Sequence, residues 1–495
     1  MSLQYAAIDL GSNSFHLLVI RRVNDEIQVV DKLRERVRLA QGLRDDKRLD
    51  GVVRRRALAC LSNFKQRLAD VPTANIRVCG TNTFRKMADS DVFLAEAELA
   101  LGRRIEIVSG QEEARLVYRG VCQNLDVSDE KRLVIDIGGG STECIVGQGD
   151  AISRADSLYM GCVDYTVRFF KKQKITQQAI DKAIIAARLE VGSLHRAFKS
   201  IGWAVCYGSS GTINAIQDVL AATGRNPDEI TELDLTWLLG EVVQAGHVDQ
   251  LRFQGLKPER AEVFTAGLCI LYGLFRSLAI ERMCASTSAM REGIIADVLG
   301  RIRDKDIRDE TVRRMGMRYS SDLAHSERVA HVVDELARQA LPVWGIDTPE
   351  NRSLLNWAAQ LHEVGKAINY TGYHRHGSYL VANSNMAGFS RRQQALLAAL
   401  VLGQRRKLIP SRISALVGRD ATTALKLIVL FRIASRLCRT RSPNPRPPIM
   451  MTLNSHQLTL GFPDGWLASK PLTLGDLIEE KRWLSSAGFD LIWTG

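Results

Sequence analysis

An early hydrophobic pattern in the chain is YAAIDLGSNSFHLLVI, residues 5–20. Two apolar runs flank a short polar segment, and apolar runs of this length bounded by Gly, Ser and Asn predict two β-strands joined by a tight turn. The polar positions in and before the turn are Asp9, Gly11, Ser12, Asn13 and Ser14. A carboxylate and a flexible turn are therefore expected between two strands.

The same pattern recurs in KRLVIDIGGGSTECIVG, residues 131–147. The two stretches align without a gap, so that Asp9 matches Asp136, Gly11 matches Gly138 and Ser14 matches Ser141. The second turn supplies Gly138, Gly139, Gly140, Ser141 and Thr142. We interpret the first part of the chain as two related α/β halves.

A third glycine-containing turn occurs in VCYGSSGTINAIQDVL. A strand-like run leads into Gly208, Ser209, Ser210, Gly211 and Thr212, and a helical pattern follows. The N-terminus of a helix binds anions, so this turn is a further candidate phosphate contact, although alone it is a weak signal.

The three turns suggest a site for a phosphorylated ligand. Turn glycines allow close approach of the backbone, and successive N–H groups form a nest for phosphate oxygens. Asp9 and Asp136 would repel a phosphate, and a hard cation between the carboxylates and the phosphate removes this repulsion. Mg²⁺, which takes few carboxylates as ligands, suits this position. The alternative is a pair of ordinary hairpins, but neither turn is the Asn-Gly pair that hairpin chemistry alone prefers.

A candidate for activating water lies between the hairpins, in IEIVSGQEEARLVYRGV. Ser109 and Glu112 have the spacing of a capping box, so Glu112 is expected to serve the start of a helix. Glu113 is then available to orient or deprotonate a water molecule beside a bound phosphate. The alternative for Glu113 is a favourable charge at a helix N-terminus.

Two further charged residues have two interpretations each. Glu143 follows the second turn on the outgoing strand, where it is either a second acid in the same cleft or a solvent-facing side chain. Arg85, in VCGTNTFRKMADS, either clamps a phosphate or pairs with an acid.

Composition places limits on the class of protein. The chain has 495 residues, of which 45% are hydrophobic and 25% charged, which favours a globular protein of about three domains. The longest apolar run is shorter than the roughly 18 residues of a membrane span, and we expect neither a membrane partner nor a secretory signal. Nine scattered cysteines without a CxxC pair favour a reducing, cytoplasmic location. The net charge of +12 favours a polyanionic partner, with a solvated basic surface as the alternative.

Taken together, the motifs resemble the exopolyphosphatase and guanosine pentaphosphate phosphohydrolase family. DLGSNSFHLLV, GTNTFR, SGQEEARLVYRGV, LVIDIGGGSTE, MGCV and GSSGTI occur in the family's order. The resemblance implies two actin-like domains with a magnesium-dependent site in the cleft between them. It further implies that Glu113 is the general base, that Glu143 assists it and that Asp136 helps to hold Mg²⁺.

The sequence beyond about residue 304 has long helical periodicity, as in LAHSERVAHVVDELARQAL. His325, His362 and Glu363 resemble a degenerate HD phosphohydrolase domain, in which His and Asp bind metal. Because Glu363 replaces the Asp of that pair, we favour a structural role over a metal site. By analogy with relatives, this region is expected to lengthen the substrate channel and to support a homodimer.

The expected fold class is α/β, with two actin-like domains (ribonuclease H-like, in the superfamily of heat-shock ATPases and sugar kinases), an all-α HD-like domain and a short C-terminal α+β tail. The expected domains are residues 1–127, 128–304, 305–450 and 451–495.

The expected reaction is removal of the terminal 5′-phosphate of guanosine pentaphosphate to give the tetraphosphate alarmone of the stringent response, with polyphosphate as a second substrate. A dedicated exopolyphosphatase is the main alternative, since HRHGSYLVANS is similar to that branch. A kinase of the same fold is less favoured, because STSAMREG lacks the Gly pair of an adenosine site. A non-catalytic polyanion sensor is a further alternative, and we expect no specific nucleic-acid partner.

Overall fold

The structure is a computed structural model that describes residues 3–495 except 24–25, 124, 126–128, 303–305, 443–445 and 455. It divides into two compact units, Met1–Lys305 and Asp306–Gly495, which are described separately. The expected domain boundaries at 127/128 and 304/305 fall outside the described residues, and the four-domain division stays a prediction.

The first sheet of the N-terminal unit contains the first predicted hairpin. Its strands are β1 (Gln4–Leu10), β2 (Phe15–Val23), β3 (Glu26–Glu35), β4 (Ile76–Gly80) and β5 (Glu106–Ile107), in the order β3-β2-β1-β4-β5. The first three strands pair antiparallel, whereas β4 lies parallel to β1 and β5 parallel to β4. The helices of this part are α1 (Gly51–Arg67), α2 (Asn82–Lys86) and α3 (Ser90–Leu101).

Helix α1 shows how the local sequence specifies these elements. Asp50 caps its N-terminus by accepting hydrogen bonds from the N–H groups of Val52 and Val53. The buried positions recur at helical spacing and face the first sheet's hydrophobic core: Val53, Ala57, Cys60, Leu61 and Phe64.

The second sheet repeats this plan around the second hairpin. Its strands are β6 (Lys131–Ile137), β7 (Thr142–Gln148), β8 (Ala151–Leu158), β9 (Val205–Ser209), β10 (Glu229–Thr231) and β11 (Arg282–Ala285), in the order β10-β11-β9-β6-β7-β8. Strands β6, β7 and β8 pair antiparallel, β9 lies parallel to β6, and β11 lies parallel to β9. The predicted duplication is therefore confirmed at the level of strand order. The covering helices are α5 (Cys162–Phe169), α6 (Gln177–Ile201), α7 (Ser210–Ala222), α8 (Glu232–Ala245) and α9 (Pro258–Leu278).

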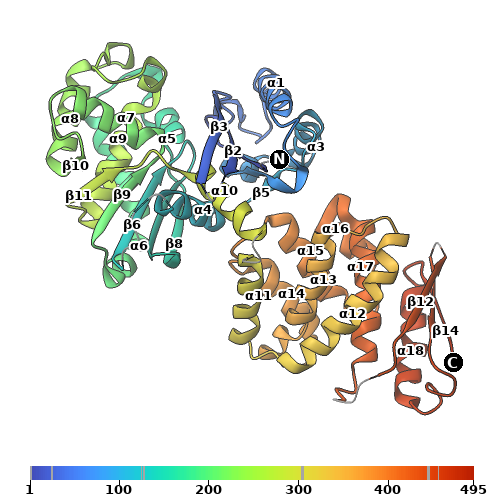
Figure 1. The fold of residues 1–495 in the computed structure, drawn as a ribbon. Coiled ribbons are helices and arrows are strands. Elements are labelled where there is room, and N and C mark those ends of the chain that lie inside the picture. The colour runs from blue at the N-terminus through green and yellow to red at the C-terminus, as the bar shows by residue number, and fades with distance from the viewer. Residues whose placement is uncertain are drawn as a thin grey trace. The chain divides into compact units, whose positions relative to one another are not determined.

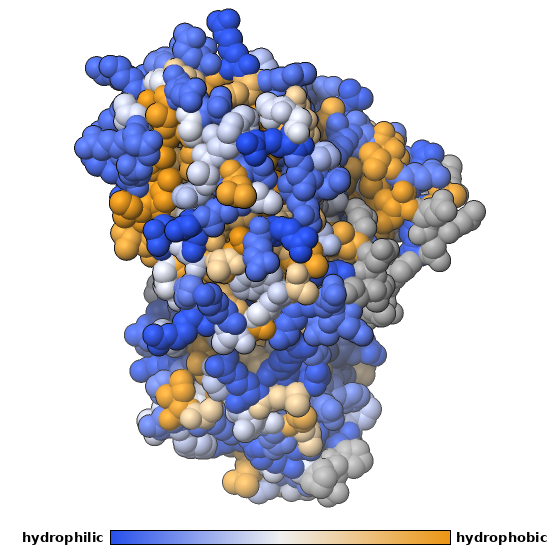
Figure 2. Space-filling view, turned by 90° about the vertical axis from the view of Figure 1, so that its left-hand side faces the viewer, coloured by the Kyte–Doolittle hydropathy of each residue, from blue (hydrophilic) through white to orange (hydrophobic). Residues whose placement is uncertain are grey.

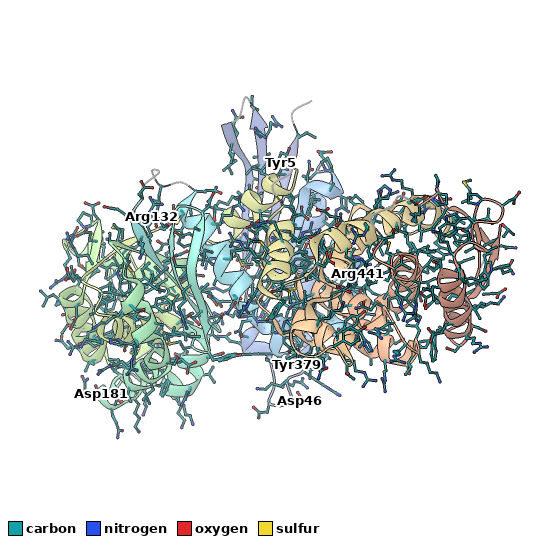
Figure 3. The ribbon with its side chains drawn as sticks, turned by 90° about the horizontal axis from the view of Figure 1, so that it is seen from below. Tyr5, Asp46, Arg132, Asp181, Tyr379 and Arg441 are labelled. Atoms are coloured by element: carbon teal, nitrogen blue, oxygen red, sulfur yellow. The ribbon has the colours of Figure 1, made fainter. Side chains whose placement is uncertain are left out.

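Two helices lie between the sheets, as Figure 1 shows: α4 (Gly110–Cys122) and α10 (Met290–Ile302). Helix α4 follows the first sheet in sequence but packs on β7 and β8, whereas α10 follows the second sheet and packs on β1. One hydrophobic cluster joins side chains of both sheets and both helices, among them Tyr5, which is labelled in Figure 3. The pair α4 and α10 therefore connects the two halves.

Helix α9 is the most apolar long helix of the part of the chain that the structure describes. By length and composition alone it could cross a membrane, and 72% of its most apolar window is buried inside the protein. Its buried side chains join the core beside the second sheet.

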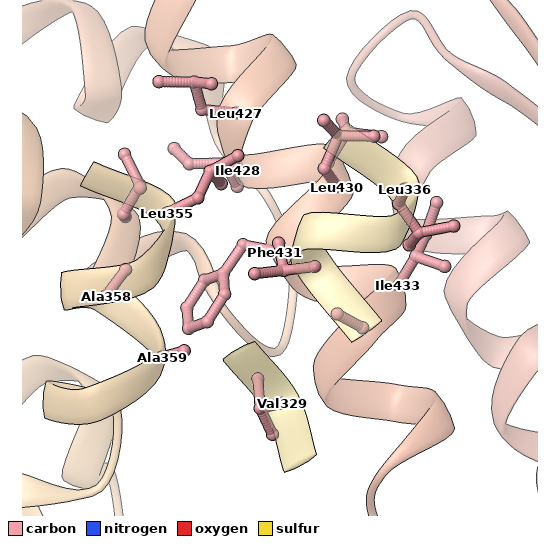
Figure 4. Close-up of a cluster of buried hydrophobic side chains, with 14 of the residues drawn as sticks. Val329, Leu336, Leu355, Ala358, Ala359, Leu427, Ile428, Leu430, Phe431 and Ile433 are labelled. Atoms are coloured by element: carbon pink, nitrogen blue, oxygen red, sulfur yellow. The ribbon is translucent and has the colours of Figure 1, made fainter. Parts of the chain in front are cut away.

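The C-terminal unit is helical and ends in a small sheet. Its helices are α11 (Ile307–Arg318), α12 (Leu323–Val343), α13 (Pro349–Leu361), α14 (Tyr373–Asn383), α15 (Arg391–Gly403), α16 (Pro410–Val417), α17 (Ala421–Leu437) and α18 (Pro471–Ser485). The sheet has the order β12-β13-β14, from β12 (Met450–Asn454), β13 (Gln457–Gly461) and β14 (Asp490–Thr494). Figure 4 shows the packing of α12, α13 and α17 through side chains such as Val329, Ala358 and Phe431. The predicted all-α region and α+β tail are confirmed.

The face of the molecule drawn in Figure 2 is mainly hydrophilic. Apolar side chains gather there in small separate groups, as is usual for the surface of a folded protein.

Candidate active site

The two hairpin turns have the same internal hydrogen bond. The Gly11 N–H donates to the Ser14 carbonyl at 3.2 Å, and the Gly138 N–H donates to the Ser141 carbonyl at 2.9 Å. The strand pairing also matches, because Asp9 lies opposite His16 and Asp136 lies opposite Glu143. Each turn therefore presents a carboxylate beside a short, polar backbone segment.

A cavity of about 450 Å³ brings the three glycine-containing turns together. Most of the predicted site residues line it: Asp9, Gly11, Ser12, Asn13, Ser14, Glu113, Asp136, Gly138, Gly139, Gly140, Ser141, Ser210, Gly211 and Thr212. The turns come from both sheets, and the third comes from the junction of β9 and α7. Residues as far apart in sequence as Asp9 and Thr212 thus surround one space.

Five predicted residues are not among those that line the cavity: Arg85, Thr142, Glu143, Gly208 and Ser209. The Thr142 hydroxyl donates to the Met160 carbonyl at 2.7 Å, and the Ser209 hydroxyl donates to the Ser288 carbonyl at 3.0 Å. A side chain on Gly208 would meet the Met283 sulfur at 2.5 Å. The predicted phosphate contacts of these three positions stay predictions.

Glu113 lies in the first turn of α4. Ser109 caps this helix by accepting a hydrogen bond from the Glu112 N–H at 3.1 Å. Arg85 Nη1 donates to Glu113 Oε2 at 2.8 Å and to the Val108 carbonyl at 2.9 Å. In this structure Arg85 therefore pairs with an acid, as one of its two interpretations expected, and it fixes the direction of the Glu113 carboxylate.

Four carboxylates lie near one another: Glu113 and Glu143 are buried, and Asp9 and Asp136 are partly buried. Burial raises the pKa of Asp9 to about 8 and the pKa of Asp136 to about 7, and in each case the charge of Glu113 adds to the shift. Burial also raises the pKa of Glu143 well above its usual range, with the charges of Glu113 and Asp136 in support. Ser157 Oγ donates to Glu143 Oε1 at 2.8 Å, so Glu143 is an inward acid and does not face solvent.

These carboxylates have the properties of a cation site. Asp136 Oδ1 is buried and accepts no hydrogen bond from any described residue. Neighbouring negative charges that are shielded from solvent are stable only when protons or a cation compensate them. The arrangement of Asp9 and Asp136 therefore fits a divalent cation with oxygen ligands.

The cavity also has cationic lining residues, here called the basic wall, which the sequence motifs did not predict. They are Lys32, Arg34, Lys257, Arg260 and Arg291. Arg291 Nη1 donates to Nδ1 of His16 at 2.9 Å, and burial together with the Arg291 charge lowers the His16 pKa to about 3. Arg260 lies against Gly211, where an added Cβ would come within 1.7 Å of the guanidinium. The cavity lining thus contains both the carboxylates and these basic side chains.

The match to protein families follows the same division of the chain. Residues 18–302 match the model of the Ppx/GppA phosphatase family, and residues 307–481 match the model of Ppx/GppA phosphatase domain III. The chain belongs to the Ppx/GppA phosphatase family. The resemblance inferred from the motifs is therefore confirmed.

Relatives within the Ppx/GppA phosphatase family align over nearly the whole chain. A protein named guanosine-5′-triphosphate,3′-diphosphate pyrophosphatase from Aeromonas hydrophila is 39% identical over 476 residues, which cover 96% of this chain and 95% of the relative. A protein of the same name from Vibrio atlanticus is 37% identical and covers 98% of this chain and 97% of the relative.

Solved structures confirm the fold. An exopolyphosphatase from Cytophaga hutchinsonii superimposes with a TM-score of 0.55 at 23% identity, covering 60% of this chain and 97% of that one. A Ppx/GppA family member from Aquifex aeolicus gives a TM-score of 0.52 at 21% identity, covering 61% of this chain and 99% of that one. The predicted fold class, with its actin-like α/β part, is confirmed.

In the domain III region, His325, His362 and Glu363 place one ligand-type atom each within 4.8 Å of one another. However, Lys366 Nζ lies 2.5 Å from Glu363 Oε1, and Arg441, labelled in Figure 3, lies 2.6 Å from Oε2. Two cations already compensate the Glu363 charge, which favours the structural role over a metal site.

Proposed function

We propose that this protein hydrolyses the terminal 5′-phosphoanhydride of guanosine pentaphosphate to give guanosine tetraphosphate, and that it also releases orthophosphate from the ends of polyphosphate. The observation that carries the proposal is the cavity that Glu113, Asp9 and Asp136 line together with three glycine-containing turns. The names and near-complete alignment of the relatives support the nucleotide substrate. This conversion changes the amounts of the two alarmones, which gives the protein a role in the stringent response.

Asp9 and Asp136 would hold Mg²⁺, since both are partly buried carboxylates with raised pKa values and one Asp136 oxygen accepts no hydrogen bond from a described residue. When bound, Mg²⁺ neutralises charge on the phosphate oxygens and orients the terminal phosphate. The two matched turns, 11–14 and 138–141, bind the phosphate oxygens through N–H groups and hydroxyls.

Glu113 acts as the general base. Its carboxylate accepts a proton from water as the water oxygen attacks the terminal phosphorus, and the bond from that phosphorus to the bridging oxygen breaks. The electron pair stays on the bridging oxygen of the leaving phosphate. Arg85 holds one carboxylate oxygen of Glu113, which leaves the other for water. Glu143 is the neighbouring acid that assists this step, and its raised pKa keeps it protonated.

The basic wall holds the remaining phosphates of a long or branched polyanion. Lys32, Arg34 and Arg260 line the same cavity as the carboxylates, so one ligand can contact basic and acidic side chains together. Guanidinium groups bind phosphate through charge-assisted hydrogen bonds. A substrate with phosphates beyond the scissile bond fits this wall, and both guanosine pentaphosphate and polyphosphate have them.

The cytoplasm is the proposed location, because all nine cysteines are free thiols and the substrates are intracellular nucleotides and polyphosphates. A homodimer without specific nucleic-acid or membrane partners completes the proposal.

The test is phosphate release measured in parallel on guanosine pentaphosphate and on polyphosphates of graded length, with and without Mg²⁺. We expect Mg²⁺-dependent release from both, with the higher kcat/KM on the nucleotide. A higher value on polyphosphate would favour the dedicated exopolyphosphatase. If the protein released phosphate from neither substrate, the enzyme proposal would be refuted and a polyanion sensor would be favoured.

A further inference from the structure

A buried network of ion pairs lies next to Glu113 but outside the cavity. Arg115 Nε lies 2.7 Å from Glu112 Oε2, and Arg115 Nη2 lies 2.6 Å from Asp297 Oδ1. Arg77 Nη1 lies 2.7 Å from Asp297 Oδ2, and Arg77 Nη2 lies 3.4 Å from Glu112 Oε1. The side chains of Glu112 and Asp297 are each 1% exposed, so this network is shielded from water.

The network joins three elements from both halves of the N-terminal unit. Arg77 belongs to β4 of the first sheet, Glu112 and Arg115 belong to the first turns of α4, and Asp297 belongs to α10. Helix α4 itself packs on the second sheet, so Arg77 ties its first turn back to the first sheet. The network therefore fixes α4 at the place where the two halves meet.

Glu112 and Glu113 are consecutive residues of one helical turn and point in different directions. Successive side chains of an α-helix are about 100° apart around its axis. Glu112 is held by two guanidinium groups, whereas Glu113 lines the cavity. Any rotation of the turn that moves one carboxylate also moves the other.

We propose that Glu112 is a positioning residue, which together with Arg77, Arg115 and Asp297 fixes the rotation of the first turn of α4 and thereby the position of the Glu113 carboxylate. This inference rests on the proposed role of Glu113 as the base. Side-chain atoms lie about 5–6 Å from a helix axis, so a rotation of about 10° displaces a carboxylate by about 1 Å. A displacement of this size can cost about 100-fold in rate.

The test is the variant Glu112→Gln, which keeps the size of the side chain and removes its charge. We expect kcat to fall by about 10–100-fold, while KM and the Mg²⁺ concentration at half-maximal rate change by less than about 3-fold. Arg77→Lys, which keeps the charge and removes the forked geometry, is expected to give the same pattern and serves if Glu112→Gln does not fold.

A double-variant cycle separates positioning from a general loss of stability. If Glu112 acts through Glu113, then adding Glu112→Gln to Glu113→Gln lowers kcat no further. The matched control is Glu480→Gln in the C-terminal unit, because Glu480 is fully buried and paired with Arg432. We expect this control to lower thermal stability and to leave kcat unchanged.

Two results would overturn the inference: a folded Glu112→Gln protein with normal kcat, or equal losses from Glu112→Gln in the presence and absence of Glu113. A different result, full activity of Glu113→Gln, would instead refute the proposed function of Glu113. The two failures are therefore distinguishable.

Discussion

Contact between the backbones of α4 and α10 should be essential for the site, and Gly120→Ala tests it. A Cβ on Gly120 would lie 1.9 Å from the Ala289 carbonyl oxygen and 2.7 Å from the Gly293 nitrogen. Ordinary contacts of a Cβ are 3.4 Å or longer, so the helices must separate by about 1.5 Å. Because backbone atoms are met, no side-chain rotation can relieve the clash.

We expect this substitution to destabilise the N-terminal unit by about 1–3 kcal/mol, the usual range for overpacking. The separation also moves α4, so kcat should fall by about 10–100-fold through displacement of Glu113. Thermal unfolding and phosphate release measure the two effects.

The matched control is Gly192→Ala in the middle of α6, where an added Cβ has no neighbour within 4 Å. Alanine there should stabilise the protein by about 0.5–1 kcal/mol, because glycine is unfavourable inside a helix. Unchanged stability and kcat in Gly120→Ala would show that the two helices slide freely, and the account of a rigid helix pair would be wrong.

Three further predictions concern the cavity. Glu113→Gln should lower kcat by about 10²–10⁴-fold in phosphate-release assays, since it removes proton transfer. Calorimetry should still detect binding of guanosine pentaphosphate to this variant. A variant that loses binding but keeps kcat would contradict the role of Glu113 as the base. Arg260→Ala should raise KM about 10–100-fold through loss of a charge-assisted contact, whereas Arg282→Ala, an exposed residue outside the cavity, should leave KM unchanged. Mg²⁺ should raise the unfolding temperature more at pH 8.5 than at pH 6, and Asp136→Asn should abolish the difference, as scanning fluorimetry can show.

The sign of the Mg²⁺ prediction follows from the raised pKa values. Asp9 and Asp136 have folded-state pKa values of about 8 and about 7, above their usual value of 3.8. An acid with a raised pKa stabilises the metal-free fold while it is protonated, and this stabilisation is lost as the pH rises from about 4 through the folded-state values. Mg²⁺ replaces the lost protons, so its effect is largest at alkaline pH.

Local patterns predicted the parts of this site that are local in sequence. Apolar runs around the turns at 11–14 and 138–141 specified both hairpins, and the gapless alignment of Asp9 with Asp136 predicted their equivalence. The N-cap at Ser109 was correct, because capping depends on a spacing of three residues. Glu112, which was expected to complete a capping box, instead pairs with Arg115. Glu113 lines the cavity and Glu112 does not, while the role of Glu113 as the base stays a prediction.

Contacts over long sequence distances could not be predicted in the same way. The pairing of Arg85 with Glu113 depends on how α2 and α4 pack, and sequence alone left Arg85 with two interpretations. Only one part of the basic wall could have been predicted from the sequence. Lys32 and Arg34 are two residues apart on β3, so they face the same side of a strand, whereas Arg260 and Arg291 join them only through tertiary packing.

Helix α4 packs on the second sheet and α10 on the first, and this crossing explains why the proposed base belongs to neither hairpin. Both hairpins place their carboxylates, Asp9 and Asp136, beside the turns, where the proposed mechanism places the cation and the phosphate oxygens. An acid that deprotonates water must instead lie beyond the terminal phosphorus, on the side away from the leaving group. Helix α4 can supply such an acid because it follows the first sheet in sequence but packs on the second, and Glu113 in its first turn lines the cavity. In the proposed mechanism the duplicated turns therefore bind the phosphates and α4 supplies the reactive group, so catalysis depends on the relative placement of the two halves.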